Sequence, residues 1–452
     1  MVRHYLFFLP LIFAAVNLAA KPNILFIAVD DLNDWVGHLG GHSQAKTPNI
    51  DRLAGRGVSF TKAYCNAPLC NPSRVSLFSG ILPSNSGVYG NGERMRDKIP
   101  DTVTLMQYLR KAGGYSVQGG GKTFHGSGPY DEASWDFYNA PSRKRHSAKR
   151  EEGLSDDAWA PWGPLDVDDS EMFDVKNVNW AISELKKSHA KPFFIACGFT
   201  KPHMPWYVPQ KYFDLHPLES IKLPDTLEGD TEDLPVFGKK LAIEVYDPSG
   251  EKNFAVEGGD HKNVLANKQW HRAVQSYLAT ISFVDAHVGR LLDALENSEH
   301  ADNTIIVLWG DHGWHLGEKE HWRKHALWDV TTRTTLIMAG PQAIAKGQLC
   351  DRPVSLIDLY PTMLELTAVP LREGLDGQSL VPLLENPKRL WEKPVLMTYG
   401  YKNHVVQIDR WRYIEYHDGG RELYDHLTDP NEWTNLASDP KYRTVMGNLQ
   451  RS

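Results

Sequence analysis

Four short apolar runs, each followed at once by polar residues, constrain most strongly what this chain can fold into. Continuous apolar runs of this length are typical of parallel strands that are covered on both faces. The segments between the runs have helical spacing, and alternating strands and helices predict a mostly parallel α/β sheet covered by helices. The expected strands are 23–29, 115–118, 192–199 and 304–309, and the expected helices are 50–56, 103–112, 175–188 and 269–295.

The polar residues that follow these runs are the first candidates for a functional site. In open α/β sheets, ligands bind beyond the carboxyl ends of the strands. We therefore expect the four polar groups to converge at one edge of the sheet, although they are far apart in the sequence. They are Asp30 with Asp31, Gly121 with Lys122, Lys201-Pro202-His203, and Asp311 with His312.

The two ends of the chain differ from its middle. Residues 1–20 have a short basic start, an apolar stretch and Ala19-Ala20, which predicts a cleaved signal peptide and export to the periplasm or medium. An uncleaved N-terminal anchor is the alternative. No later apolar run is long enough to cross a membrane.

From about 390, short aromatic-rich strands and a terminal helix predict a small antiparallel sheet. We therefore expect a large α/β domain (21–388) and a C-terminal α+β subdomain (389–452).

Composition excludes several classes of protein. The 452 residues carry a formal charge of −7, which argues against a nucleic-acid partner. Four cysteines are too few for a disulfide scaffold, although an exported chain could form two bridges among them. The stretch 129–170 is expected to be a loop, and its basic run at 143–150 is either solvated surface or a contact for an anionic chain. Residues 214–262 resemble an irregular insertion at a pocket rim.

The segment Leu69–Gly80, LCNPSRVSLFSG, is the sharpest local feature. Cys70 precedes a helical pattern with Pro72 near its start, as helix N-termini prefer. A group at that position faces unpaired backbone N–H groups, which attract anions. From spacing alone, a buried structural cysteine is an equally good interpretation.

The Cys-x-Pro-Ser-Arg motif at Cys70, with Ser79-Gly80 after it, resembles the signature of the type I, formylglycine-dependent sulfatases. Further segments resemble that family in the same order along nearly the whole chain after residue 20, and their forms are most similar to the iduronate-2-sulfatase-like branch. The resemblance implies an alkaline-phosphatase-like fold. The segments are NILFIAVDD, TPNIDRLAGRGVSFTKAY, GGGKTFHG, KPHMPW, GDHGWHLGE and RELYDHLTDPNEWTNLA.

The same resemblance implies a chemistry. Cys70 would be oxidised to formylglycine (3-oxoalanine) by a maturation enzyme, and the hydrated aldehyde would supply two hydroxyls. One hydroxyl attacks sulfur and releases the alcohol; the other collapses to the aldehyde and expels sulfate. One Ca²⁺ would be held by Asp30, Asp31, Asp311 and His312, with residue 70 completing its shell. The expected substrate is a sulfate ester on a carbohydrate.

The remaining site roles also follow from the resemblance. Lys122 would clamp the sulfate, His125 would act as the base that eliminates sulfate, and Arg74 would hold the hydrated aldehyde. His203 would contact sulfate and help to protonate the leaving oxygen, and Lys324 would be a second cation. Arg94, Arg96, Trp206 and Trp314 could contact the sugar, although tryptophans more often pack in cores.

Other interpretations are weaker but open. A P-loop needs glycine where Ser116 stands, and the four histidines at 312, 315, 321 and 325 match no zinc spacing, so His315 and His321 are expected to be pocket-lining or surface groups. A phosphonate or phosphodiester hydrolase of the same superfamily shares the formylglycine motif. A non-catalytic sulfoglycan-binding protein would be expected to lack Cys70, Lys122 or His125.

Overall fold

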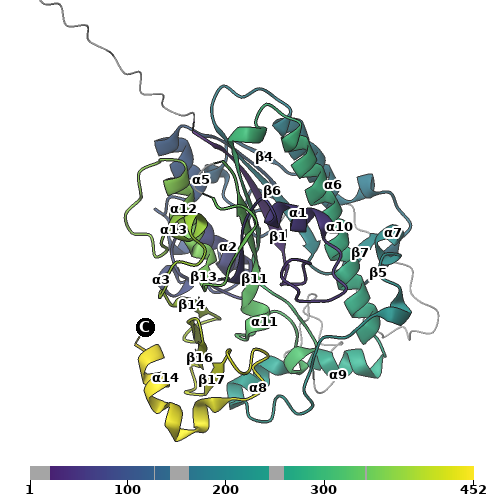
Figure 1. Cartoon of the computed structure of the whole chain (residues 1–452), viewed down its shortest axis with the longest axis vertical. Coiled ribbons are helices and arrows are strands. Elements are labelled where there is room, and N and C mark those ends of the chain that lie inside the picture. The colour runs from purple at the N-terminus through teal and green to yellow at the C-terminus, as the bar shows by residue number, and fades with distance from the viewer. Residues whose placement is uncertain (1–20, 127, 143–161, 244–258, 342–343, 452) are drawn as a thin grey trace, which may run out of the picture.

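The computed structural model describes residues 21–126, 128–142, 162–243, 259–341 and 344–451 (Figure 1). The expected signal peptide (1–20) and the basic run at 143–150 lie outside these residues.

A nine-stranded sheet forms the centre of the molecule, in the order β12-β2-β11-β8-β1-β6-β3-β4, with β13 also paired to β2. Every pairing is parallel except those of β11 with β2 and β8. The predicted mostly parallel α/β sheet is therefore confirmed. The strands are β1 (Asn23–Asp30), β2 (Gly57–Tyr64), β3 (Ser116–Gly121), β4 (Phe137–Asn139), β6 (Phe193–Pro202), β8 (Thr304–Gly310), β11 (Arg333–Ala339), β12 (Gln348–Cys350) and β13 (Val354–Ser355).

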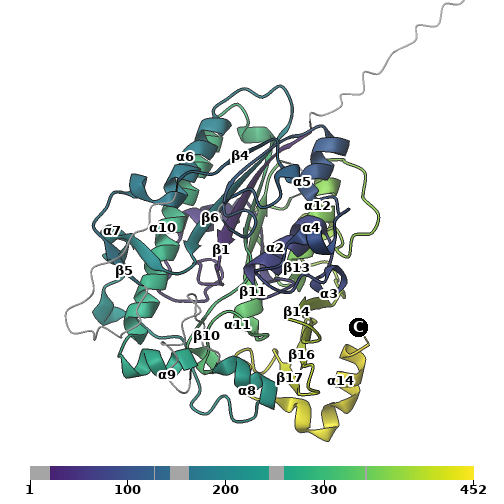
Figure 2. The same ribbon diagram turned by 180° about the vertical axis from the view of Figure 1, so that it is seen from behind.

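Helices cover both faces of this sheet, which is why its strands are apolar throughout. Leu25, Ile27 and Val29 of β1 belong to a core with α1 (Pro48–Ala54), α6 (Phe173–Leu185) and α10 (Trp270–Glu296). The alternate residues of β1 pack in a second core with α2 (Cys70–Ser79), α5 (Leu105–Tyr108) and α12 (Leu359–Leu366). Figures 1 and 2 show these two helical layers on opposite sides of the sheet.

Several expected elements differ from the structure. The expected helix 103–112 is α5 followed by one π-helical turn, Leu109–Gly113, which ends at Gly114 in the left-handed conformation. The expected loop 129–170 contains β4, an edge strand that pairs with β3 over three residues, and β5 (Trp162–Leu165). Strands this short carry too little periodicity to be predicted. The segment 214–262 likewise contains α8 (Val236–Ala242) and the start of α9 (Gly259–Ala266).

Short elements complete the main part of the chain. They are α3 (Pro83–Ser86), α4 (Met95–Lys98), α7 (Gln210–Phe213), α11 (Asp329–Thr332) and α13 (Val381–Glu385), with the strand pairs β5–β7 (Trp206–Pro209) and β9 (His315–Leu316)–β10 (Trp322–Arg323).

The C-terminal part is the expected antiparallel sheet with one helix. Its strands are β14 (Val395–Thr398), β15 (His404–Gln407), β16 (Trp411–Glu415) and β17 (Arg421–Asp425), followed by α14 (Arg443–Leu449). Met397 and Ile414 share a buried cluster with Trp328 of the main part. Trp328 Nε1 also donates a 2.8 Å hydrogen bond to the buried Glu422 carboxylate. The C-terminal sheet thus packs firmly on the main domain.

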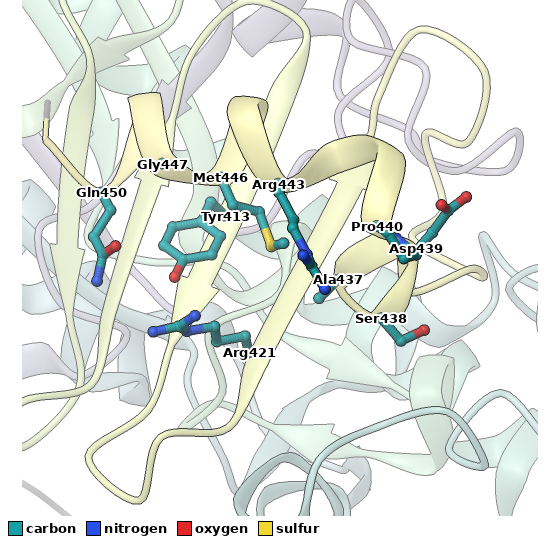
Figure 3. A pocket seen from close by; sticks show the side chains of 10 residues that line it. All are labelled: Tyr413, Arg421, Ala437, Ser438, Asp439, Pro440, Arg443, Met446, Gly447 and Gln450. Carbon is teal, nitrogen blue, oxygen red and sulfur yellow. The ribbon is translucent and has the colours of Figure 1, made fainter.

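A surface pocket of about 360 Å³ lies between this sheet and α14, lined among others by Tyr413, Arg421 and Arg443 (Figure 3). None of the predicted site residues lines it.

The four cysteines, all described, are free and buried, so the two possible disulfides are not formed. Within the described ranges no helix combines the length and the apolar character that crossing a membrane requires.

Candidate active site

Cys70 is the first residue of α2, at the edge of the sheet where β1, β3, β6 and β8 end. Its Sγ lies 3.0 Å from Lys324 Nζ, 3.4 Å from His312 Nε2 and 3.8 Å from Lys122 Nζ. Lys122 follows β3, and His312 and Lys324 follow β8, so side chains far apart in the sequence converge around this thiol as expected. Cys70 is completely buried, as is every residue of α2.

The electrostatics of Cys70 differ from those of the other cysteines. Burial and Asp30 raise its pKa, but Lys122 and Lys324 outweigh them, and the pKa lies below its usual value. Burial, with a smaller contribution from Asp351, raises the pKa of Cys350 to about 11. Cys70 is therefore the thiol at which negative charge is stabilised, whereas Cys65 and Cys197, with pKa values raised by burial, are inert core residues.

Arg74 is buried within the site and is not a surface ion pair. Its Nε donates to Asp311 Oδ2 at 2.8 Å and its Nη2 to Asp30 Oδ1 at 3.0 Å, while Nη1 donates to the carbonyls of Thr123 and Lys122. Because Arg74 follows Cys70 by one helical turn, it shares the inner face of α2. The guanidinium thereby fixes two strand-end carboxylates against the helix that carries Cys70.

Two lysines lie next to the Cys70 thiol, and each contacts a carboxylate. Lys122 Nζ contacts Asp30 Oδ2, and Lys324 Nζ donates to Asp31 Oδ1 at 2.8 Å. Burial disfavours the ammonium of Lys324, but Asp31 and Cys70 outweigh it and hold its pKa well above its usual value. The pKa of Lys122 is raised by Asp30 in the same way, against the effect of burial. Both side chains are therefore charged cations next to residue 70.

The predicted metal ligands form two overlapping clusters that share Cys70. Asp30, Asp31, Cys70 and His203 offer ligand atoms within 4.8 Å of one another, and so do Cys70, Asp311 and His312. His203, expected only near sulfate, therefore also lies within reach of this cluster. Asp31 Oδ2 is buried and has no hydrogen-bond partner among the described residues. Carboxylate oxygens that are gathered and left unpaired suit a hard divalent cation.

Protonation in this cluster reflects the crowding of its carboxylates. Burial raises the pKa of Asp31 to about 7, with Asp30 adding to the effect and Lys324 opposing it. Burial disfavours the charged form of His312, but Asp311 outweighs it and raises the pKa of His312 to about 9. His312 Nε2 lies 3.3 Å from Asp31 Oδ1 and 3.7 Å from Asp311 Oδ2, so this imidazole faces both carboxylates.

Tyr277, in the middle of α10, is a site residue that the sequence analysis missed. Its hydroxyl donates to the backbone carbonyl of Asp31 at 2.7 Å and accepts from the N–H of Asn33 at 3.1 Å. Asp31 has a φ of 58°, a left-handed conformation that costs energy for a residue with a side chain. Nothing in the sequence separates Tyr277 from the core aromatic residues of an amphipathic helix.

The two predicted catalytic histidines lie at the outer side of the site. The side chain of His203 is 30% exposed, its Nε2 is 4.0 Å from Asp31 Oδ2, and its Nδ1 contacts the Met204 carbonyl. Burial and then Lys122 lower the pKa of His125 to about 4, and they lower that of His203 well below its usual value. Both imidazoles are neutral, and Nδ1 of His125 has no hydrogen-bond partner among the described residues.

Other candidates prove to be structural. His315 and His321 are buried, not exposed: Thr331 Oγ1 contacts His315 Nδ1, and the Lys324 carbonyl contacts His321 Nε2 at 2.8 Å. The sequence could not show this, because both lie in a segment without periodicity. Arg96 forms an ion pair with Asp131 at 2.7 Å. Trp206 and Trp314 are buried in the core that includes α10.

Three carboxylates (Asp30, Asp31, Asp311) face three cations (Arg74, Lys122, Lys324) in the buried site. The imidazole of His312, whose pKa is raised to about 9, adds positive charge beside them, so the site is suited to a negatively charged group at residue 70. The arrangement favours a nucleophilic attack on an anionic ester whose oxygens are held by the lysines.

Comparison with known proteins agrees with this geometry. A family model described as "Sulfatase" matches residues 22–369, and one described as "N-sulphoglucosamine sulphohydrolase, C-terminal" matches 317–452. The chain is 41% identical to a sulfatase of Formosa agariphila over 95% of this chain and 86% of that protein. It is 30% identical to choline-sulfatase of Rhizobium meliloti (93% and 83%) and 33% identical to human iduronate 2-sulfatase (80% and 67%).

Solved structures share the fold. A 2-O GAG sulfatase superposes with a TM-score of 0.73 at 24% identity, over 95% of this chain and 90% of that one. A phosphonate monoester hydrolase from Silicibacter pomeroyi superposes with a TM-score of 0.76 at 22% identity, over 95% and 94%. Taken with the family models and the relatives, these findings show that the chain belongs to the sulfatase family, the enzymes that hydrolyse sulfate esters.

Proposed function

We propose that this protein removes sulfate from a sulfated carbohydrate, using formylglycine at position 70 and one Ca²⁺. The observation that carries the proposal is the position of the Cys70 thiol between the charged Lys324 and Lys122 and the cluster of buried carboxylates. Sugar as the substrate class is supported by the similarity to human iduronate 2-sulfatase.

The residues present fit a calcium ion. The unpartnered Asp31 Oδ2 and the carboxylates of Asp30 and Asp311 offer hard oxygen ligands, with His312 and residue 70 next to them. A bound Ca²⁺ would polarise a sulfate oxygen, and a hydrated formylglycine would supply the attacking hydroxyl. Arg74 keeps Asp30 and Asp311 in place, and the two lysines hold the remaining sulfate oxygens.

We assign His125 and His203 to separate proton transfers. His125 is neutral with a free Nδ1, so it can accept the proton whose loss from residue 70 expels sulfate. His203 is the more exposed of the groups near Asp31, on the side where an alcohol would leave. It is neutral here, but an anionic substrate raises the pKa of a nearby imidazole, and His203 would then donate to the leaving oxygen.

The test has two parts. Mass spectrometry of protein made with a formylglycine-generating enzyme is expected to show residue 70 as the aldehyde; fully active protein with only unmodified Cys70 would refute the proposed nucleophile. A panel of position-defined sulfated sugars, with choline sulfate included, is expected to give turnover of a sugar. Turnover of choline sulfate alone would refute the substrate class.

A phosphonate or phosphodiester hydrolase with the same formylglycine is the second candidate, because such an enzyme shares the fold. Comparing 4-nitrophenyl sulfate with phenylphosphonate monoesters and aryl phosphodiesters separates the two functions. Hydrolysis of the phosphorus esters without any sulfate ester would favour this alternative.

We also propose that residues 1–20 are a cleaved signal peptide and that the protein is exported, as the sequence of that segment indicates. The proposed division into a catalytic domain (21–388) and a subdomain (389–452) is supported by the start of the antiparallel sheet at Val395. N-terminal sequencing of protein secreted by the host tests the cleavage near Ala19-Ala20.

A further inference from the structure

The loop that carries Tyr89 is hydrogen-bonded to Asn71, the residue after Cys70. The side-chain amide of Asn71 donates to the carbonyls of Gly90 at 2.8 Å and Glu93 at 2.7 Å, and the N–H of Asn71 donates to Asn91 Oδ1 at 3.0 Å. The loop 89–94 is therefore held against the first turn of α2. Asn71 occupies the x position of the Cys-x-Pro-Ser-Arg motif, and its hydrogen bonds hold the loop on which Tyr89 lies.

A turn of the C-terminal sheet also lies near the residues around Cys70. The N–H of Thr398 at the end of β14 donates to the carbonyl of Asn66 at 2.9 Å, four residues before Cys70. His325 follows Lys324 directly, and its ring stacks on Tyr399 at 5.9 Å and 15°. Tyr399 and Asn403 pair through their backbones and close the turn 399–403. In both overall views β14 lies beside α3, the helix that precedes residues 89–94 in the sequence (Figures 1 and 2).

Tyr89 and Tyr401 meet where these two segments come together. Their rings are 6.3 Å apart at 75°, an edge-to-face pair between parts of the chain more than 300 residues apart. Two series of contacts therefore lead from Cys70 to this pair. One passes through Asn71 and its loop to Tyr89, and the other passes through Lys324, His325 and Tyr399 to Tyr401. Exposure rises along both series: Cys70 and Lys324 are buried, Tyr89 and His325 are half-buried, and Tyr401 is 67% exposed. The tyrosine pair is thus the exposed end of these contacts, and we refer to it as the rim.

The charge on this rim is positive. Arg94 and Lys402 are exposed, and neither has an ion-pair partner among the described residues; Lys402 Nζ lies 5.1 Å from the Tyr401 ring. The acid of the loop, Glu93, is already engaged by the N–H of Gly90 and by Lys98. A cationic alcohol such as choline would be repelled here, whereas an anionic sugar would be attracted.

We propose that Tyr89 and Tyr401 pack against the sugar ring whose sulfate ester lies at residue 70, and that Arg94 and Lys402 favour sugars with a further negative charge. The inference rests on the proposed function and names the residues that select the substrate. Tyrosine rings suit this task because they offer apolar area at a low entropic cost. One ring comes from the main domain and the other from the turn between β14 and β15 of the C-terminal sheet.

The test compares Tyr401→Ala with Tyr401→Phe and with Phe137→Ala, a matched loss of an exposed ring (51%) on the edge strand β4. With the sulfated disaccharide that the wild-type enzyme hydrolyses fastest, Tyr401→Ala is expected to raise KM by roughly tenfold with little change in kcat, as loss of uniform binding does. Tyr401→Phe and Phe137→Ala are expected to behave like wild type. Inhibition by inorganic sulfate, which reports on the site around residue 70, is expected to be unchanged.

A second measurement keeps this inference separate from the proposed function. Binding of the same disaccharides to Cys70→Ala protein is measured by calorimetry with and without Tyr401→Ala, because binding needs no turnover. If the disaccharide binds to the Cys70→Ala protein but not to the protein that also carries Tyr401→Ala, the result supports a sugar contact at Tyr401 even if no variant is active. An unchanged KM and unchanged binding in Tyr401→Ala would overturn the inference while leaving sulfate hydrolysis untouched, and so would a wild-type enzyme that hydrolyses aryl sulfates but binds no sulfated sugar.

Discussion

The hydroxyl of Tyr277 donates a 2.7 Å hydrogen bond to the backbone carbonyl of Asp31. Tyr277 comes from the middle of the longest helix, α10, and Asp31 directly follows the last residue of β1. The bond fixes the peptide of a residue with a φ of 58° and so determines where its carboxylate points. The N–H of Asp31 is fixed as well, by Asp311 Oδ1 at 2.9 Å. A core helix therefore positions one of the proposed calcium ligands.

Replacing Tyr277 by Phe is expected to weaken calcium binding. The change leaves the Asp31 carbonyl and the Asn33 N–H without their buried partner, at a cost of about 1–3 kcal/mol in the free energy of unfolding. Part of that cost is relieved if Asp31 leaves its strained conformation, which displaces the carboxylate. Calcium titration by calorimetry, with urea denaturation of the metal-free protein, measures both effects.

Tyr360→Phe is the matched control. Tyr360 is also buried and donates to a backbone carbonyl, that of Val103 at 3.0 Å, but it contacts no predicted site residue. It is expected to lower stability by a similar amount and to leave calcium affinity unchanged. Equal calcium affinities for both variants would contradict a positioning role for Tyr277.

Asp311→Asn is expected to remove the stabilisation that Ca²⁺ provides. In the intact protein, calcium that binds only the folded state raises Tm by mass action. The variant keeps the shape of the side chain but loses a carboxylate that also pairs with Arg74. Asp329→Asn, which alters another buried ion pair, that with Arg333 at 2.7 Å, is expected to lose stability yet keep the calcium-dependent rise in Tm. Differential scanning calorimetry with and without chelator shows the difference.

His216 is expected to make the folded protein less stable in acid. Burial lowers the pKa of His216 to about 4 from its usual 6.5, so between these values the unfolded chain takes up protons that the folded protein does not. Its contribution to stability is therefore complete above pH 6.5 and falls as the pH drops toward 4. His216→Gln is expected to flatten this part of the pH dependence of the urea midpoint.

His271→Gln, on the exposed face of α10, serves as the control for His216 and should leave that pH dependence unchanged. If both variants keep the full acid sensitivity of the wild type, other groups cause it.

Conversion of Cys70 is expected to require an unfolded chain. Cys70 and the rest of α2 are fully buried, so a maturation enzyme has no access to the thiol in the folded protein. Folded, unmodified protein incubated with a formylglycine-generating enzyme is expected to stay unmodified, whereas a peptide spanning 65–80 is expected to be converted. Peptide mass spectrometry measures both, and efficient conversion of the folded protein would show that α2 opens.

The arrangement of the strand ends could be predicted because parallel strands place their carboxyl ends together, and Asp30, Lys122 and Asp311 each follow an apolar run. The contribution of α10 could not, because hydrophobic spacing shows that Tyr277 faces inward but not which backbone group it meets. The buried state of His315 and His321 could not be predicted either, since both rings pack on Trp328, which itself packs against the C-terminal sheet. Local pattern identifies the groups that follow strands, and long-range packing determines which residues position them.

The roles of His125 and His203 can be separated by the step at which each variant fails. His125→Ala is expected to release one equivalent of desulfated sugar and then stall with sulfate retained on the protein, because the proton acceptor for sulfate release is missing. His203→Ala is expected to be slow in the first step, and less so for 4-nitrophenyl sulfate, whose leaving group needs little protonation. A rapid-quench burst assay with intact-mass analysis measures both. Retained sulfate in His203→Ala but not in His125→Ala would reverse the two assignments.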